Sequence, residues 1–116
     1  MALPKTTKQP YEKFFIGVDF TQALEADEDI DLSNSSVTAV DKDGDDATSI
    51  IIESGSKQID TAEPEDVPYT PQDDAMLSAR VQGGIEDDSP YKLTYRIVTT
   101  AGNQYEKDVK LKVKEL

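Results

Sequence analysis

Apolar and polar residues alternate along the last quarter of the chain. In YKLTYRIVTT, residues 91–100, every second position from Tyr91 to Ile97 is aromatic or aliphatic, and the positions between them carry lysine, threonine and arginine. In KDVKLKVKEL, residues 107–116, valine and leucine alternate with aspartate and lysine. This period of two predicts two half-buried antiparallel strands, each with one solvated face. The intervening TAGNQ contains a Gly-Asn pair typical of a hairpin turn, so we expect these strands to form a hairpin.

Four shorter segments upstream also have strand-like patterns. Residues 13–20 are aromatic and β-branched, 75–82 alternate clearly, 36–42 alternate weakly, and 48–54 form a β-branched run. Together with the hairpin they give six or seven strands at the spacing typical of a β-sandwich. The pattern therefore predicts an all-β fold, an antiparallel β-sandwich of about seven strands. Residues 21–27 fit a single helical turn beside it.

Two segments do not read as strands. DTAEPEDVPYTPQDD, residues 60–74, holds three prolines, six acidic residues and no basic residue, which predicts a long surface loop. The first twelve residues contain two prolines and two lysines without a strand pattern. We expect residues 1–12 to be a flexible N-terminal arm. Residues 13–116 then form a single sandwich domain with a proline-rich acidic loop at 60–74.

Composition narrows the chemistry of the protein. The 116 residues include neither cysteine nor histidine, so the usual ligands of zinc, haem and iron–sulfur clusters are missing, and His- or Cys-based catalysis is impossible. We expect no cofactor. The net charge of −12 disfavours nucleic acid and anionic membranes as partners and favours a basic protein surface. No apolar run approaches the roughly 20 residues needed to cross a bilayer, and we expect no secretory signal at the N-terminus.

The segment DKDGDD, residues 41–46, raises the question of calcium binding. A helix–loop–helix calcium site needs oxygen ligands at positions 1, 3 and 5, glycine at 6 and glutamate at 12. Counted from Asp41, position 6 is Asp46 and position 12 is not glutamate, so the spacing fails. Asp43-Gly44 instead suits a two-residue type I′ hairpin turn, in which both residues have positive φ. We expect an acidic hairpin tip without a metal; the alternative is a weak, irregular calcium site at Asp41, Asp43, Asp45 and Asp46.

Acidic runs and a lysine-rich strand are candidates for docking to a partner. Acids concentrate at residues 25–29 and in the 60–74 loop, which also contains a tyrosine, and the last strand carries lysines on its polar face. If the acids of one copy met the lysines of the next, the contact would build rings or stacks. The alternatives are a merely solvated acidic surface and edge-strand lysines that block aggregation. The candidate docking residues are Glu25, Asp27, Glu28, Asp29, Glu63, Glu65, Asp66, Tyr69, Lys110, Lys112 and Lys114.

Other conspicuous residues favour structural roles. Tyr91 and Tyr95 lie on the apolar face of their strand, which predicts core positions. Gly83-Gly84 lacks the strand-to-helix context of a phosphate-binding loop, so we interpret it as a turn. Facing carboxylates for glycoside hydrolysis arise easily among 24 acidic residues. We therefore assign no catalytic residue and expect no enzyme, with a small carboxylate-dependent hydrolase as the alternative.

The C-terminal part of the chain resembles a known class of proteins. Residues 81–115 contain a strand ending in Gly-Gly, a strand that begins with Tyr and ends in Val-Thr-Thr, a Gly-containing turn, and a final V-x-L-x-V strand. GVDFTQAL, residues 17–24, adds an Asp-aromatic pair. These segments resemble small tailed-phage virion proteins with an immunoglobulin-like fold, and the resemblance extends over about two-thirds of the chain. Phe20 stands where that family often has tryptophan, and an insert like residues 60–74 is not usual in it.

The resemblance implies a non-enzymatic structural part of a bacteriophage virion. Such a protein would be a head–tail or fibre-attachment adaptor or a decoration protein, made in the host cytoplasm and located in the virion. Its partners would be other virion proteins, with a homo-oligomer in the assembled particle. The alternative function is an immunoglobulin-like binding module that recognises a cell-surface polysaccharide or another ligand.

Overall fold

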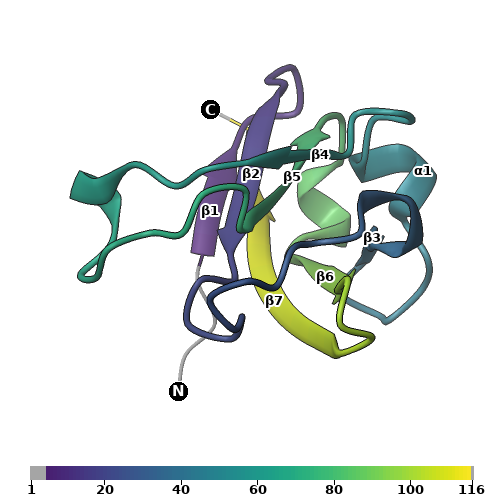
Figure 1. The fold of residues 1–116 in the computed structure, drawn as a ribbon. Helices are drawn as coiled ribbons and strands as arrows, with labels where there is room; N and C mark the ends of the chain where they lie inside the picture. The colour runs from purple at the N-terminus through teal and green to yellow at the C-terminus, as the bar shows by residue number, and fades with distance from the viewer. Residues whose placement is uncertain (1–4, 116) are drawn as a thin grey trace.

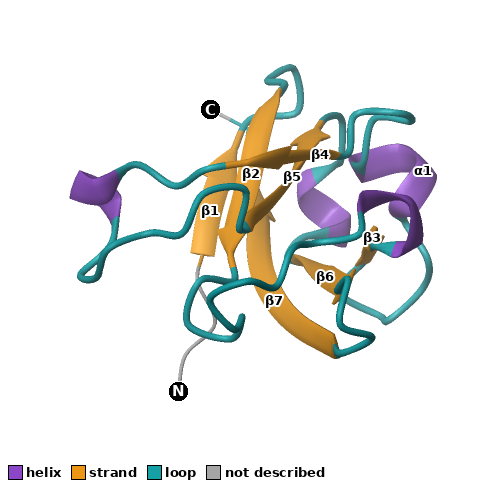
Figure 2. Ribbon diagram, viewed as in Figure 1, coloured by secondary structure: helices purple, strands orange, loops and turns teal. Residues whose placement is uncertain are grey.

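Two sheets face each other in the computed structural model, which describes residues 5–115 (Figures 1 and 2). One sheet has the strand order β1-β7-β6-β3, and the other has the order β2-β5-β4. The predicted all-β sandwich of about seven strands is confirmed. The strands within the described residues are β1 (Lys5–Lys8), β2 (Phe14–Asp19), β3 (Ser36–Val40), β4 (Gln58–Asp60), β5 (Met76–Val81), β6 (Tyr91–Val98) and β7 (Gln104–Val113).

Within residues 5–115, helical structure consists of short segments between the strands. The described helices are α1 (Thr48–Ile51) and the 3₁₀ helices η1 (Leu32–Asn34), η2 (Pro64–Asp66) and η3 (Glu86–Asp88). Within residues 5–115 the structure contains no helix with the length and apolar character needed to cross a bilayer.

The alternating side chains of both sheets form the core. The predicted C-terminal hairpin is confirmed, because β6 and β7 pair antiparallel from Tyr91↔Leu111 to Val98↔Gln104. Tyr91 and Tyr95 are buried as expected. The Tyr95 hydroxyl donates to the Ile16 carbonyl oxygen at 2.8 Å, so this side chain also ties the first sheet to the second.

The predicted flexible arm is wrong for residues 5–8, which form β1; residues 1–4 lie outside the described residues. β1 pairs parallel with the end of β7, in the register Lys5↔Lys110 to Lys8↔Val113. Lys8 is buried, and its Nζ donates to the carbonyl oxygens of Gln9 at 2.7 Å and Gly83 at 2.6 Å. Main-chain pairing and the Lys8 bonds thus hold in place a segment whose sequence has no strand pattern. Because β1 runs parallel to β7, this strand pair of the sandwich is parallel and not antiparallel.

The predicted strand over residues 48–54 is also wrong. Residues 48–51 form α1, and only Ile52 makes a β-bridge, to Val81. Asp46 Oδ1 accepts the N–H of Thr48 at 3.0 Å, and this bond stabilises the start of the helix. Ile51 is completely buried at the end of α1, so the apolar run contributes to the core as one helical turn. The strand β4 has no counterpart among the predicted strands.

Candidate docking surfaces

The acidic loop, residues 60–74, projects from the sandwich beyond the ends of β4 and β5 (Figure 1). Hydrogen bonds at its base tie it to the end of β2. Tyr69 Oη donates to Asp19 Oδ2 at 2.7 Å, and the Gln72 N–H donates to Thr21 Oγ1 at 2.8 Å. The loop is therefore held in place by named contacts while its outer part extends into solvent.

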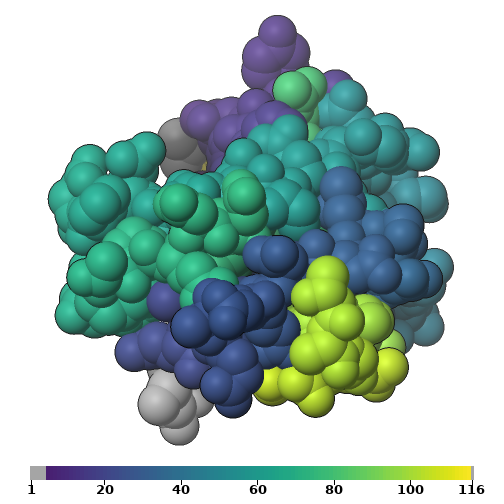
Figure 3. All heavy atoms as spheres, viewed as in Figure 1, coloured from purple at the N-terminus to yellow at the C-terminus, as the bar shows by residue number. Residues whose placement is uncertain are grey.

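The outer part of the acidic loop presents carboxylates. Glu63, Glu65 and Asp66 are all exposed, and they lie in or next to the 3₁₀ helix η2. None of the ion pairs found in residues 5–115 involves them. In the space-filling view the segment forms a protruding lobe (Figure 3). Three of the predicted docking residues thus share one accessible projection.

Tyr69, the fourth docking candidate in this loop, serves a different purpose. Its side chain is half-buried, and its hydroxyl is engaged by Asp19. Desolvation, together with the bond to the Asp19 carboxylate, raises the pKa of Tyr69 to about 12. The residue positions the loop, so its hydroxyl is not available to donate to a partner.

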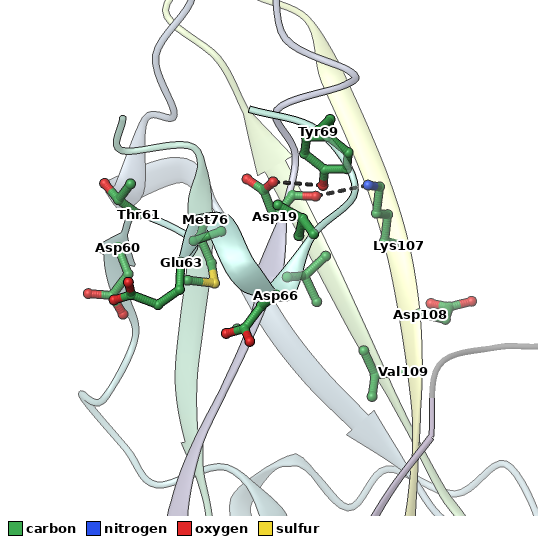
Figure 4. Close-up of a pocket in the computed structure, with 14 residues that line it drawn as sticks. Asp19, Asp60, Thr61, Glu63, Asp66, Tyr69, Met76, Lys107, Asp108 and Val109 are labelled. Atoms are coloured by element: carbon green, nitrogen blue, oxygen red, sulfur yellow. Dashed lines mark hydrogen bonds between the residues drawn. The ribbon is translucent and has the colours of Figure 1, made fainter. Parts of the chain in front are cut away.

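A pocket of about 1080 Å³ lies under the acidic loop, against β2 and β7 (Figure 4). Asp60, Glu63 and Asp66 reach it from the loop side, and Lys107 reaches it from β7. Lys107 Nζ donates to the Asp19 carbonyl oxygen at 2.9 Å. Within residues 5–115 no group of three or more acidic side chains is arranged to hold a metal ion. The lining offers carboxylate acceptors beside apolar surface.

The second acidic segment, residues 25–29, divides into exposed and buried positions. Glu25, Asp27 and Asp29 are exposed. Glu28 is only 2% exposed, so its prediction as a docking residue is wrong. Its carboxylate accepts hydrogen bonds from the Thr99 hydroxyl, the Glu25 N–H and the Asn103 side-chain amide.

These bonds make Glu28 a structural carboxylate. The bond from Thr99, then those from Glu25 and Asn103, hold the pKa of Glu28 below its usual value. Since Thr99 and Asn103 belong to the β6–β7 turn, the side chain fastens the 25–29 segment to that hairpin. The local sequence around Glu28 gives no sign of its contact with Asn103, which lies 75 residues away in the chain.

The DKDGDD segment is a turn, but not of the predicted type. Gly44 has a φ of 85°, whereas Asp43 has no positive φ, so the type I′ prediction is wrong. The Gly44 N–H donates to the Asp41 carbonyl oxygen at 3.1 Å, which places Lys42 and Asp43 at the centre of the turn. Asp41 Oδ1 accepts the N–H groups of Asp43 and Asp45 at 2.9 and 3.0 Å. Hydrogen bonding within the segment therefore determines the turn.

Lysines gather on the outer face of the four-stranded sheet. β7 pairs with β1 on one side and β6 on the other, and its register sets Lys110 opposite both Lys5 and Lys92. Lys112, two positions further along β7, points to the same side. All four side chains are exposed. We call Lys5, Lys92, Lys110 and Lys112 the basic face.

The position of β7 changes the interpretation of its lysines. Lys110 and Lys112 were candidates for protecting an edge strand, but β1 covers β7 at these positions, so that alternative is wrong for them. Lys114 is exposed just beyond the end of β7. The predicted docking residues do not include Lys5 and Lys92, which the sheet register sets beside Lys110. The alternation in β6 identifies Lys92 as outward-facing, but its neighbour across the sheet depends on the strand register.

Comparison with known proteins adds no relative: a scan against protein-family models finds no match, and a search of curated proteins finds no significant similarity.

Proposed function

We propose that the protein is a non-enzymatic structural component of a bacteriophage virion, a head–tail or fibre-attachment adaptor or a decoration protein, which acts by docking to other virion proteins. The observation that carries the proposal is the presence of two oppositely charged surfaces on the same sandwich. The acidic loop projects from one sheet, and the basic face covers the end of the other. Charge complementarity of this kind steers and orients protein association.

The strand order supports an immunoglobulin-like assignment within this proposal. In constant-type domains of this fold the first, second, fifth and fourth strands form one sheet, and the third, sixth and seventh form the other. The sheets here match this division for β2 to β7, whereas β1 lies beside β7 in the other sheet. Tyr91 begins β6, and its hydroxyl oxygen accepts the N–H of Ile85 at 3.1 Å. A tyrosine at this corner that bonds to the upstream backbone is typical of the fold.

The carboxylate environments favour a non-enzymatic role. A glycosidase acid needs a raised pKa so that it carries a proton at neutral pH. Hydrogen bonds instead lower the pKa of Glu28, Asp31 and Asp46. Each of these carboxylates accepts bonds from neighbouring hydroxyl, amide or backbone groups, as expected for structural acids.

Mass spectrometry of purified phage particles from the source strain tests the proposal. We expect peptides such as IVTTAGNQYEK at a fixed ratio to the major capsid or tail protein, and that ratio would distinguish a ring, a fibre attachment and a shell. Matched lysates treated identically but lacking particles provide the control. Presence in infected or uninfected cells together with absence from particles would rule out the virion role.

The pocket under the acidic loop supports the second candidate function, binding of a cell-surface polysaccharide or another ligand. Its carboxylates are acceptors for sugar hydroxyls, and Tyr69 lies in its wall. A carbohydrate-array screen of the purified protein tests this role. Specific binding that Asp60→Ala weakens would favour it over the virion role, and no binding to any glycan would remove it.

A further inference from the structure

The basic side chains divide into those used within the molecule and those left over. Six of the twelve lysines and arginines take part in hydrogen bonds or ion pairs within residues 5–115. They are Lys8, Lys13, Lys57, Arg80, Arg96 and Lys107. The remaining six have no such contact with the described residues. They are Lys5, Lys42, Lys92, Lys110, Lys112 and Lys114.

The leftover lysines are close together because of the sheet register. Lys5, Lys110 and Lys92 form a row across three neighbouring strands, where side chains directly opposite lie about 5 Å apart. Val40 pairs with Lys92, so Lys42 follows just beyond the same end of the sheet. Like charges placed directly opposite one another destabilise a sheet. The protein as a whole has a net charge of −12, but at this cluster a negatively charged partner would reduce the repulsion among the lysines.

A hollow in the basic face suits a carboxylate. It has a volume of about 220 Å³, and three of its lining residues are Lys5, Lys110 and Lys112. Glu86 also lines it, but forms none of the ion pairs found in residues 5–115. Three lysines around one acid leave the hollow with an excess of positive charge, so an incoming carboxylate gains attraction.

We propose that the basic face binds the acidic loop of a second copy of this chain, with Glu63 and Glu65 directed at the lysine row. This inference rests on the proposed docking function and names the partner. Each copy carries both surfaces, so the contact can repeat from copy to copy and gives either an open row or a closed ring.

Three properties of the molecule favour a second copy over another polyanion. The loop projects from the body and is anchored at its base by Tyr69 and Gln72, so little ordering is needed on binding. Its six acids are accompanied by no base. The net negative charge of the whole molecule repels nucleic acid, whereas a projecting loop brings a few carboxylates to the lysines and keeps the two bodies apart.

Charge reversal at each surface tests the contact. Sedimentation velocity at low ionic strength measures self-association of the full chain, of a loop variant (Glu63→Lys with Glu65→Lys) and of a face variant (Lys110→Glu with Lys112→Glu). We expect the wild-type chain to associate in a salt-sensitive manner. Each variant alone should have a self-association affinity at least about tenfold lower than the wild-type chain. A mixture of the two variants should regain association, because each reversed surface then meets a complementary one.

The matched control reverses two acids elsewhere. Asp27→Lys with Asp29→Lys makes the same change in net charge as the loop variant, at exposed positions beside the β6–β7 turn, away from the basic face, and should leave association unchanged. The proposal is overturned if the wild-type chain remains monomeric, if the control loses association as the loop variant does, or if mixing restores nothing. Circular dichroism of each variant verifies that it is folded before association is compared.

These outcomes are independent of the virion test. Presence in particles together with a monomeric wild-type chain leaves the virion role intact and assigns the basic face to a different acidic protein. Salt-sensitive association with restoration on mixing, together with absence from particles, supports the contact and removes the virion role.

Discussion

At the scale of single residues, the least expected features are two buried charges. Lys8 and Glu28 are 1% and 2% exposed, although charged side chains are rarely buried unless they are paired. Lys8 donates hydrogen bonds to its neighbours Gln9 and Pro10 and to the distant Gly83. Glu28 accepts bonds from nearby Glu25 and from the distant Thr99 and Asn103. Burial lowers the pKa of Lys8, against a smaller opposing effect of Glu12. Both side chains join a loop to the strand framework, so they act in stability and not in docking.

Replacement of Glu28 by Gln should lower the melting temperature at neutral pH, because an amide cannot accept all the bonds that the carboxylate accepts. The pKa of Glu28 is lower in the folded state than in the unfolded chain. The stability it contributes is therefore fully present above the unfolded pKa and is lost as pH falls through the folded pKa. Thermal melts of both proteins between neutral and strongly acidic pH should converge at low pH. Glu25→Gln, at an exposed neighbour, should give no such convergence, and a constant difference at all pH values would contradict the role of the carboxylate.

Gly84 is a second residue whose identity the fold requires. It has a φ of 89°, and an added Cβ would lie 2.9 Å from Val113 Cγ2 and 3.0 Å from Ile51 Cδ1. Gly84→Ala should therefore cost about 2–4 kcal/mol, from the left-handed backbone and the steric overlap together. Gly102 has a φ of 85° with open space around it, so Gly102→Ala should cost only about 1–2 kcal/mol. Urea denaturation measures both, and equal losses would show that crowding at Gly84 has no effect.

At the scale of elements, β1 determines the character of the basic face. It pairs with the end of β7 and supplies Lys5, which extends the row made by Lys92 and Lys110. The outward positions of the four-stranded sheet therefore combine a cluster of like charges at one end with the Arg96–Glu106 ion pair further along. The strand β1, which the sequence pattern does not predict, thus adds a third lysine to the row of Lys92 and Lys110.

The lysine row should be intrinsically unfavourable for the monomer. Lys110→Glu places an acid between Lys5 and Lys92, and this change should raise the free energy of unfolding by about 0.5–1 kcal/mol. Lys114→Glu makes the same change in net charge beyond the end of the strand and serves as the control. Urea denaturation at low protein concentration gives the comparison. A loss of stability in Lys110→Glu but not in Lys114→Glu would mean that the row is not strained by repulsion.

The 41–46 turn should need no calcium. Asp41 and Asp46 accept backbone hydrogen bonds within the turn and at the start of α1, so the segment is organised by its own groups. Calcium at millimolar levels should shift the melting temperature very little. Magnesium at the same ionic strength controls for charge screening. A saturable rise of several degrees specific to calcium would restore the weak metal site at this turn.

At the scale of the whole molecule, charge is the dominant property. A net charge of −12 on 116 residues opposes the compact state through self-repulsion. The acids concentrate in loops, and the unengaged bases concentrate on one end of one sheet. The molecule therefore has an uneven charge distribution. A basic partner would meet the acidic loop, and an acidic partner would meet the basic face.

Salt should stabilise the monomer and weaken its association. Raising sodium chloride to about 0.5 M reduces the screening length to about 4–5 Å, so net self-repulsion falls and the melting temperature should rise. The same salt should reduce the association measured by sedimentation, because that contact depends on opposite charges. Measurement of both at matched protein concentrations separates the two effects. A parallel rise of stability and association would point to an apolar interface instead.

The sequence by itself determined the strands with a regular period. β2, β3, β5, β6 and β7 and the C-terminal hairpin follow from alternation, because a half-buried strand exposes every second residue to water. It also placed Tyr91 and Tyr95 in the core and the acidic loop on the surface. The resemblance to phage proteins was carried by these same strands and turns.

The tertiary structure alone decided the features that depend on distant contacts. β1 forms because β7 offers unpaired backbone groups, and residues 48–51 become helical because Ile51 fills the core. Glu28 is buried because Thr99 and Asn103 satisfy its carboxylate. The basic face exists because the register aligns lysines from three strands. Local sequence does not encode these outcomes, since each depends on which segments, far apart in the chain, come to lie side by side.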